Sequence, residues 1–204
     1  MGLYDRFILP RLIDLAMRSS EATRYRAATL AAAEGRVLEM GIGSGLNLPF
    51  YGSGVREIVG VDPSAELLRM AGPRAAAARF PVSFVNRGGE NLPFENASFD
   101  VAVTTWTLCT IRDAPAALAE MRRVLKPGGH LLFVEHGRAP DPGVARWQTR
   151  LNPLWRRCAG GCNLDRPIAE LIAAAGFRID RLETGYARAP KPMGFMYQGS
   201  AHPR

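Results

Sequence analysis

The chain has 204 residues and a mass of 22.2 kDa, the size of one ordinary domain. Hydrophobic residues make up 47% and charged residues 22%, a balance that excludes a disordered or coiled-coil chain. The net charge of +7 comes from 24 arginines and two lysines, and most of the excess follows residue 137, where it could attract an anionic substrate or an anionic membrane surface.

Cysteine content and hydropathy set the expected compartment. The three cysteines are a small and odd number, so we expect no disulfide framework and a reducing environment. No apolar run approaches the roughly 20 residues of a membrane-spanning helix, and the first residues lack a secretory signal pattern. The sequence therefore predicts a cytoplasmic protein whose residues 1–204 form a single domain.

Predicted strands and helices alternate from residue 36 onward. Short apolar runs predict buried strands at residues 36–40, 57–62, 82–86, 99–104 and 129–136. Helices are predicted at residues 64–78, 113–125 and 167–175, and two further strands at 177–187 and 194–201. Residues 126–129, with the sequence Lys-Pro-Gly-Gly, are expected to end the second of these helices. The alternation predicts βαβ units and an α/β fold with a mostly parallel sheet.

Two segments lie outside this alternation. Residues 1–30 carry an apolar stripe at helical spacing with an interruption at Pro10, and residues 142–162 carry a second amphipathic pattern. We expect the first to be an N-terminal helical lid and the second a substrate-side insertion. Three interpretations stay open for both segments: cover for the hydrophobic core, lids over a substrate site, and peripheral contact with a membrane surface.

A glycine-rich turn follows the first predicted strand. Gly41, Gly43 and Gly45 allow a tight turn that brings backbone N–H groups against a ligand. Asp62 ends the second predicted strand, 21 residues after Gly41, where a carboxylate can accept both hydroxyls of a ribose. The turn and the carboxylate together predict a site for a cofactor that contains adenosine.

The residues around the turn distinguish between two such cofactors. A dinucleotide-binding turn has its third glycine where this chain has Leu46. Glu39 precedes the turn, and its negative charge disfavours a pyrophosphate and suits a cation with an ammonium and a sulfonium group. The sequence thus favours S-adenosylmethionine (SAM). A nicotinamide-dependent oxidoreductase and a non-catalytic SAM-binding protein are the distant alternatives.

Three motifs carry a resemblance to a known family. Three segments resemble motifs of class I SAM-dependent methyltransferases: VLEMGIGSG with GVDPS, GENLPFENASFDVAVTTWTLCTI, and EMRRVLKPGGHLLFVEH. The later segment WQTRLNPLWRRCAGGCNLDRPIAELIAAAGF is similar to the thiol S-methyltransferases. The wider group includes ubiquinone/menaquinone C-methyltransferases and bacterial phosphatidylethanolamine N-methyltransferases.

The resemblance implies a Rossmann-like, seven-stranded, mostly parallel sheet with helices on both faces and an antiparallel last strand. It implies SAM as the cofactor and S-adenosylhomocysteine as the product. It implies cofactor contacts, from the methionine end to the adenine and the methyl-transfer side, at Glu39, Gly41, Gly43, Gly45, Asn47, Asp62, Pro63, Gly89, Glu90, Thr104, Thr105 and Trp106. Gly88 departs from the acidic residue that relatives often carry there, so Glu90 or a backbone group would contact the adenine amine.

Candidates for the chemistry lie elsewhere. Glu135 and His136, at the end of the fifth predicted strand, are the candidates for a general base. Tyr4, Trp147 and Trp155 in the two outlying segments are the candidates for contact with the acceptor.

Two kinds of partner are not expected. Cys158 and Cys162 have no further Cys or His nearby in the sequence that would complete a zinc site, so no metal is predicted. Residues 104–107 lack the Asp/Asn-Pro-Pro-aromatic box of nucleic-acid base methyltransferases, so no nucleic acid is expected. The resemblance favours a small-molecule acceptor, a thiol or related chalcogenide, with a phospholipid amine or a quinone ring as the alternatives.

Overall fold

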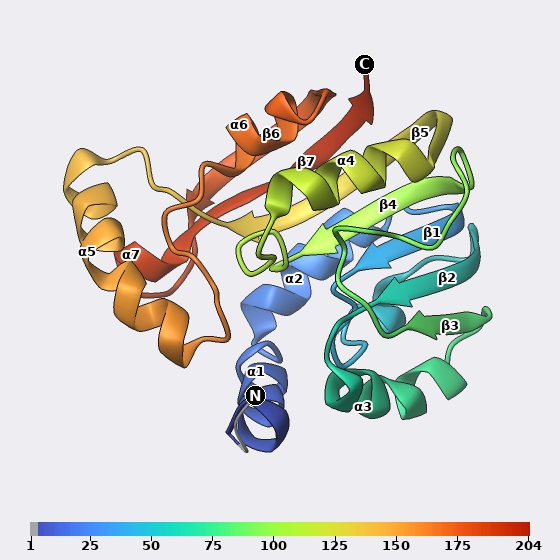
Figure 1. Cartoon of the computed structure of the whole chain (residues 1–204), viewed down its shortest axis with the longest axis horizontal. Helices are drawn as coiled ribbons and strands as arrows, with labels where there is room; N and C mark the ends of the chain where they lie inside the picture. The colour runs from blue at the N-terminus through green and yellow to red at the C-terminus, as the bar shows by residue number, and fades with distance from the viewer. Residues whose placement is uncertain (1–3) are drawn as a thin grey trace.

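A seven-stranded sheet forms the centre of the molecule. Figure 1 shows it in a computed structural model that describes residues 4–204, so the first three residues of the predicted lid lie outside the described part. The strand order is β3-β2-β1-β4-β5-β7-β6. β1 to β5 pair in parallel, and β7 runs antiparallel to both β5 and β6. The α/β fold with an antiparallel last strand is confirmed.

The strands are β1 (Gly35–Met40), β2 (Val55–Val61), β3 (Val82–Val85), β4 (Phe99–Thr105), β5 (Leu125–His136), β6 (Phe177–Tyr186) and β7 (Phe195–Pro203). The helices are η1 (Tyr4–Ile8), α1 (Leu9–Ala16), α2 (Ser20–Leu30), η2 (Leu48–Phe50), α3 (Ala65–Ala76), α4 (Ala114–Val124), α5 (Pro142–Cys158), α6 (Ile168–Ala174) and α7 (Lys191–Gly194).

Both faces of the sheet are buried. Successive residues of a strand point to opposite faces, and Leu38 of β1 accordingly joins the core cluster with Leu118 of α4, while Val37 joins the cluster with Leu30 of α2. Burial on both faces explains why the parallel strands are apolar almost throughout. The apolar runs could therefore be recognised as strands from the sequence.

β5 begins earlier than the sequence predicts. α4 ends at Val124, and Leu125 already pairs with Phe99 of β4; the register then shifts before His130 pairs with Val101. The expected stop at residues 126–129 therefore lies inside the strand as an irregularity. The backbone makes this irregularity with Gly128 at φ +80°, a conformation that glycine adopts easily.

The N-terminal segment is helical, but Pro10 does not interrupt it. Pro10 lies in the first turn of α1, where its missing N–H is not needed. The break comes at residues 17–19, and the Ser19 side chain caps α2 by accepting from the N–H of Ala22. The apolar side chains of η1 and α1 are largely exposed, among them Leu12 at 50% and Leu15 at 68%. Cover for the hydrophobic core is therefore the wrong interpretation for this stripe.

The carboxyl ends of the parallel strands share one edge of the sheet. In Figure 1, α1 and α5 lie on the side toward which the strand arrowheads point, whereas α3 and α4 flank the two faces of the sheet. Among the described residues, none of the helices combines the length and the apolar character that crossing a bilayer requires. In α/β sheets ligands bind at this edge, which is where the glycine-rich turn lies.

Candidate functional site

The turn between β1 and η2 has the backbone conformation that the glycine spacing predicts. Gly41, Gly43 and Gly45 have φ values of +71°, +56° and +78°. A Cβ atom at Gly41 would collide with the side chain of Thr107, whereas a Cβ at Gly43 would meet only the carbonyl oxygen of Gly41, at 3.9 Å. Gly43 therefore faces open space in front of the turn, as a cradle for a ligand requires.

Asp62 closes the other side of this space. Its carboxylate accepts the N–H of Gly43 at 3.0 Å and that of Ser64, the N-cap of α3, at 2.8 Å. Burial raises the pKa of Asp62, although both backbone hydrogen bonds act to lower it. Each carboxylate oxygen keeps lone pairs for further donors, so Asp62 can hold the turn and still accept ribose hydroxyls. Pro63 lies between Asp62 and the cap.

Glu39 is buried at the end of β1. Its carboxylate accepts hydrogen bonds from the side-chain amide of Asn47 and the hydroxyl of Tyr51, each at 2.8 Å. Burial raises the pKa of Glu39 to about 7, against the lowering effect of these hydrogen bonds and of the Arg26 charge. A buried carboxyl with a raised pKa is stabilised in its ionised form by an added cation, so the residues present fit a cofactor that carries an ammonium group.

α2 contributes a side chain that sequence analysis missed. Arg26 donates from Nε to Oδ1 of Asn47 at 2.9 Å, and its guanidinium lies 5.0 Å from the ring centre of Trp106. Trp106 has a φ of +50°, uncommon for a bulky residue and frequent at functional sites. Asn47 also donates to the hydroxyl of Thr105 at 2.9 Å. One network thus links the glycine turn, the end of β4 and α2.

α1 is attached to the same turn. The hydroxyl of Ser44, between the second and third glycines, donates to the buried carboxylate of Asp14 at 2.6 Å. Arg74 of α3 donates to the carbonyl of Ser44 at 2.8 Å and lies 3.5 Å from the same carboxylate oxygen. No local pattern marks Asp14 or Arg74, because each looks like an ordinary polar helix residue.

Glu135 does not have the surroundings of a general base. It is fully buried, and one carboxylate oxygen accepts from the hydroxyl of Thr104 and from the N–H groups of Thr107 and Leu108 at 2.8–3.0 Å. Burial raises the pKa of Glu135, against these hydrogen bonds. The contacts differ from the expectation of a base and make Glu135 a residue that positions the loop after β4.

His136 points to a different set of partners. Its Nε2 lies 2.8 Å from Sγ of Cys162, whose Sγ lies 3.6 Å from that of Cys109. Desolvation lowers the pKa of His136, but the hydrogen bond with Cys162 and the charges of Cys162 and Glu135 raise it more, and the net shift is upward. The histidine predicted as a base therefore has the Cys162 thiol as its hydrogen-bond partner, and the sequence did not associate the two.

The residues expected near the adenine line the ends of β1 and β3. A Cβ at Gly89 would collide with Sδ of Met40, so the close approach of these segments requires glycine. Glu90 accepts the N–H of Asp113 at 3.4 Å, and a Cβ at Gly88 would approach its carboxylate at 2.5 Å. Glu90 thus lies between the turn after β3 and the start of α4.

The three candidates for acceptor contact are not gathered in one place. The hydroxyl of Tyr4 donates to the carbonyl of Cys158 at 3.1 Å, which joins η1 to the end of α5. Trp147 is 55% exposed on α5. Trp155 has a buried indole N–H without a hydrogen-bond partner among the described residues, a donor that a ligand could satisfy.

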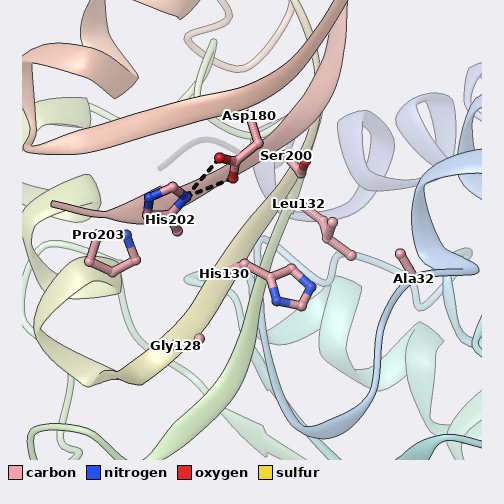
Figure 2. Close-up of a pocket in the computed structure, with 9 residues that line it drawn as sticks. Ala32, Gly128, His130, Leu132, Asp180, Ser200, His202 and Pro203 are labelled. Carbon is pink, nitrogen blue, oxygen red and sulfur yellow. Dashed lines mark hydrogen bonds and ion pairs between the residues drawn. The ribbon is translucent and has the colours of Figure 1, made fainter.

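A separate cavity lies away from this edge. Figure 2 shows His130, His202 and Asp180 around a hollow of about 410 Å³, with His202 and Asp180 2.8 Å apart. His130 belongs to the first half of β5, opposite the end that carries His136. Ligands of doubly wound sheets bind at the carboxyl ends of the strands, so we expect a cofactor at the glycine turn and not in this cavity.

Known proteins resemble the chain in sequence. Residues 38–133 match the family model described as "Methyltransferase domain". Thiol S-methyltransferase TMT1B of Homo sapiens is 34% identical over 176 residues, which cover 83% of this chain and 70% of the relative. The protein of the same name from Rattus norvegicus is 36% identical over 151 residues, which cover 72% and 62%. The phosphatidylethanolamine N-methyltransferase of Cereibacter sphaeroides is 34% identical over 120 residues, which cover 57% and 59%.

Solved structures share the fold. A geranyl diphosphate methyltransferase in complex with SAM superposes with a TM-score of 0.72 at 16% identity and covers 96% of this chain and 90% of its own. A SAM-dependent methyltransferase of Thermotoga maritima, described as a possible histamine N-methyltransferase, gives 0.70 at 22% identity with 98% of both chains covered. The chain spans between about three fifths and 70% of the length of the three sequence relatives.

Proposed function

Because the chain belongs to the SAM-dependent methyltransferases, we propose that it transfers the methyl group of SAM to the sulfur of a small thiol or related chalcogenide. The extent of the similarity to the human thiol S-methyltransferase carries this proposal. Its 176 aligned residues are many more than the 96 residues of the matched methyltransferase domain, so the similarity extends into the flanking segments. A match over 83% of the chain must extend past residue 133 through α5, at the carboxyl edge of the sheet, where an acceptor would bind.

The proposed roles of the residues follow from their contacts. Bound SAM supplies a methyl group on a positively charged sulfur, which is already a good leaving group. Glu39 would hold the ammonium of the methionine end, Asp62 the ribose, and Gly43 would leave room for the nucleoside. Trp106 and Arg26 would cover the methyl-transfer side and exclude water. Alignment of nucleophile and methyl group is then the main contribution of the protein, worth up to roughly 7–11 kcal/mol.

The acceptor requires only modest help to ionise. A free thiol has a pKa near ~8.5, so a few per cent is thiolate at neutral pH. A phospholipid amine or a quinone ring would require a base beside the acceptor. Glu135 has its carboxylate taken up by Thr104 and by backbone N–H groups, so a thiol suits this site better than either alternative.

The direct test is an acceptor panel. The protein is incubated with methyl-labelled SAM and, in parallel, an alkane thiol, hydrogen sulfide, phosphatidylethanolamine vesicles and a demethylated quinone. We expect label in the thiol or sulfide product together with S-adenosylhomocysteine, and much less label with the Asp62→Ala variant when SAM is below saturation. Transfer to the lipid or the quinone alone would contradict the thiol proposal.

The exposed apolar side chains support a peripheral contact with an anionic membrane as part of this proposal. Leu12 and Leu15 on α1, and Trp147 and Leu154 on α5, are at least half exposed. A groove of about 640 Å³ along α5 adds Arg146, Arg150 and Lys191 to Trp147. Apolar side chains beside arginines are typical of helices that lie in a lipid interface. Such a contact would bring apolar thiols to the site.

Vesicle sedimentation tests this contact. We expect the wild type to bind vesicles that contain phosphatidylglycerol and not vesicles of pure phosphatidylcholine. Arg146→Gln should bind the anionic vesicles about fivefold more weakly, because one basic residue near an anionic surface contributes about 1 kcal/mol. Leu15→Gln should also weaken binding. Leu182→Gln, an equally simple change at an exposed leucine of β6, is the control. No binding to either kind of vesicle would exclude the contact, and equal binding to both would contradict its dependence on anionic lipid.

A further inference from the structure

Three side chains from distant parts of the sequence meet at the carboxyl edge of the sheet. Cys109 follows β4, His136 ends β5, and Cys162 lies between α5 and α6. Sγ of Cys109, Nε2 of His136 and Sγ of Cys162 all lie within 4.8 Å of one another, and all three residues are buried. Neither cysteine is in a disulfide. Two thiols and an imidazole that converge in this way are the ligand types that zinc prefers.

The backbone fixes the two cysteines in this arrangement. Asn163 donates both its N–H and its side-chain amide to the carbonyl of Cys109 at 2.8 Å, which joins the segment of Cys162 to the loop after β4. Glu135 accepts the N–H of Cys109 at 3.4 Å, and His136 is part of the β5–β7 ladder. The three ligand atoms are thus held together by contacts other than their own.

The distances suit a tetrahedral zinc ion after a small adjustment. With Zn–S near 2.3 Å and Zn–N near 2.0–2.1 Å, two ligand sulfurs lie about 3.8 Å apart and a sulfur and a nitrogen about 3.6 Å apart. The two sulfurs are 3.6 Å apart, and Nε2 of His136 is 2.8 Å from Sγ of Cys162. Entry of an ion requires the last pair to separate by about 0.8 Å, as expected when a metal replaces a thiol proton between two atoms at hydrogen-bond distance. The third pair, Sγ of Cys109 and Nε2 of His136, lies within 4.8 Å and would also settle near about 3.6 Å.

We propose that Cys109, His136 and Cys162 form a zinc site with an open fourth position, and that the acceptor thiol binds to the ion there. Catalytic zinc sites use three protein ligands, Cys₂His among them, and leave one position for an exogenous ligand. The prediction of no metal rested on the absence of further ligands near Cys158 and Cys162. That premise is wrong for Cys162, because the fold brings His136 and Cys109 to it, whereas the Cys158 side chain is exposed.

The site lies on the side of the sheet edge that the acceptor needs. Cys109 is three residues beyond Trp106, on the loop that the family resemblance places at the methyl-transfer side. His136 and Cys162 each retain 9% of their surface exposed, whereas Cys109 retains 1%. The residual exposure of the cluster is therefore at His136 and Cys162, and we expect a fourth ligand to enter from their side.

The chemistry balances in protons and electrons. Binding of Zn²⁺ releases the thiol protons of Cys109 and Cys162 to water. The acceptor thiol loses its proton to water when its sulfur binds the ion. Its sulfur then forms the bond to the methyl carbon, the bond from that carbon to the sulfonium breaks, and the electron pair goes to the departing sulfur. The methylated product is a thioether, a weaker ligand than a thiolate, and leaves the ion. This role of zinc rests on the proposed thiol acceptor, but the metal site does not.

Metal binding is tested without any assay of activity. The full chain, purified under reducing conditions, is analysed for bound zinc and then reconstituted with Co²⁺, which gives thiolate-to-cobalt charge-transfer absorption when cysteines are ligands. We expect one ion per chain in the wild type and in Cys158→Ser, and at least a tenfold weaker affinity in Cys109→Ser and Cys162→Ser. A rise in melting temperature on addition of S-adenosylhomocysteine, in the wild type and in all three variants, shows that the variants fold.

Each outcome is decisive for one part of the proposal. Absence of bound zinc and of the cobalt absorption in the wild type, or the same absorption in Cys162→Ser, would overturn the metal site. So would a disulfide between Cys109 and Cys162 as the stable state in reducing buffer. If the ion binds and no thiol is methylated, the proposed function fails and the metal site stands. If thiol methylation is undiminished after a chelator has removed the ion, zinc has no part in the reaction.

Discussion

SAM binding is expected to remove a proton from Glu39. The carboxyl is buried and its pKa is raised to about 7, so in the cofactor-free protein at pH 6 it is mostly protonated. An ammonium group placed beside it stabilises the ionised form and lowers the pKa. Binding and ionisation are therefore linked, and affinity for SAM must increase as the pH rises through 7.

The size of this effect follows from the pKa. With a pKa of about 7, the ionised fraction of Glu39 is about 0.1 at pH 6 and about 0.9 at pH 8. If the carboxyl is ionised throughout in the complex, the association constant increases about tenfold between these two pH values. The complex also releases about 0.9 proton per bound SAM at pH 6 and about 0.1 at pH 8.

Calorimetry in two buffers with different heats of ionisation measures both quantities. The matched variant is Glu39→Gln, whose amide oxygen can accept from Asn47 and whose amide N–H can donate to the Tyr51 hydroxyl, and which cannot ionise. We compare the ratio of wild-type to variant affinity across pH, because titration of the SAM amino group then cancels. A ratio that does not change with pH, or no proton release at pH 6, would refute the placement of the ammonium beside Glu39.

Four further outcomes are expected from the same region. The folded-state pKa of Glu39 is raised above its usual 4.5, so its stabilising contribution to the free energy of unfolding is fully present below pH 4.5 and falls by about 3 kcal/mol as the pH rises to 7. Chemical denaturation of the wild type and of Glu39→Gln at a series of pH values measures this loss. Asp62→Ala should weaken SAM binding by about 1.5–3 kcal/mol, and unchanged affinity by calorimetry would place the ribose elsewhere. Gly43→Val should abolish SAM binding but lower the free energy of unfolding by only about 1–3 kcal/mol, because the added side chain would occupy open space in front of the turn at a left-handed φ. Equal affinity for SAM in the variant would contradict the placement of SAM in front of Gly43. Asp14→Ala removes the acceptor of the Ser44 hydroxyl, so we expect the free energy of unfolding to fall by about 1–3 kcal/mol and α1 to become sensitive to limited proteolysis. Proteolysis at the wild-type rate would argue against the attachment of α1 to the glycine turn.

The sequence predicted the parts of the structure that follow from local physics. Parallel strands buried on both faces must be apolar almost throughout, so their runs stand out. A turn that folds against a ligand needs positive φ values, so Gly43 and its neighbours mark it, and the N–H of Gly43 does bond to Asp62. The boundary of β5 was wrong because Leu125 pairs with Phe99 through a register shift that no local pattern announces.

The remaining contacts depend on how distant segments meet. Tyr51 donates to Glu39, and Arg26 donates to Asn47 beside it, from positions that look like a loop aromatic and an ordinary helix residue. Cys109 and Cys162 are 53 positions apart, and they meet only because β4 and β5 are neighbours and the chain returns to this edge between α5 and α6. A residue's partners at such separations follow from topology and register, which the spacing of residue types within one segment does not encode.

The contacts of the N-terminal helix connect cofactor binding with access for the acceptor. Ser44 lies within the turn that would hold the cofactor, and its hydroxyl is fixed by Asp14 of α1. Ten residues before Asp14 in the chain, Tyr4 of η1 donates to the carbonyl of Cys158 at the end of α5, four residues before Cys162. A shift of the turn that accommodates a ligand must therefore either break the bond to Asp14 or move α1, and movement of α1 acts on the segment that carries Cys162. Because buried hydrogen bonds are costly to leave unmade, we expect the second response, in which the acceptor side adjusts when the cofactor binds.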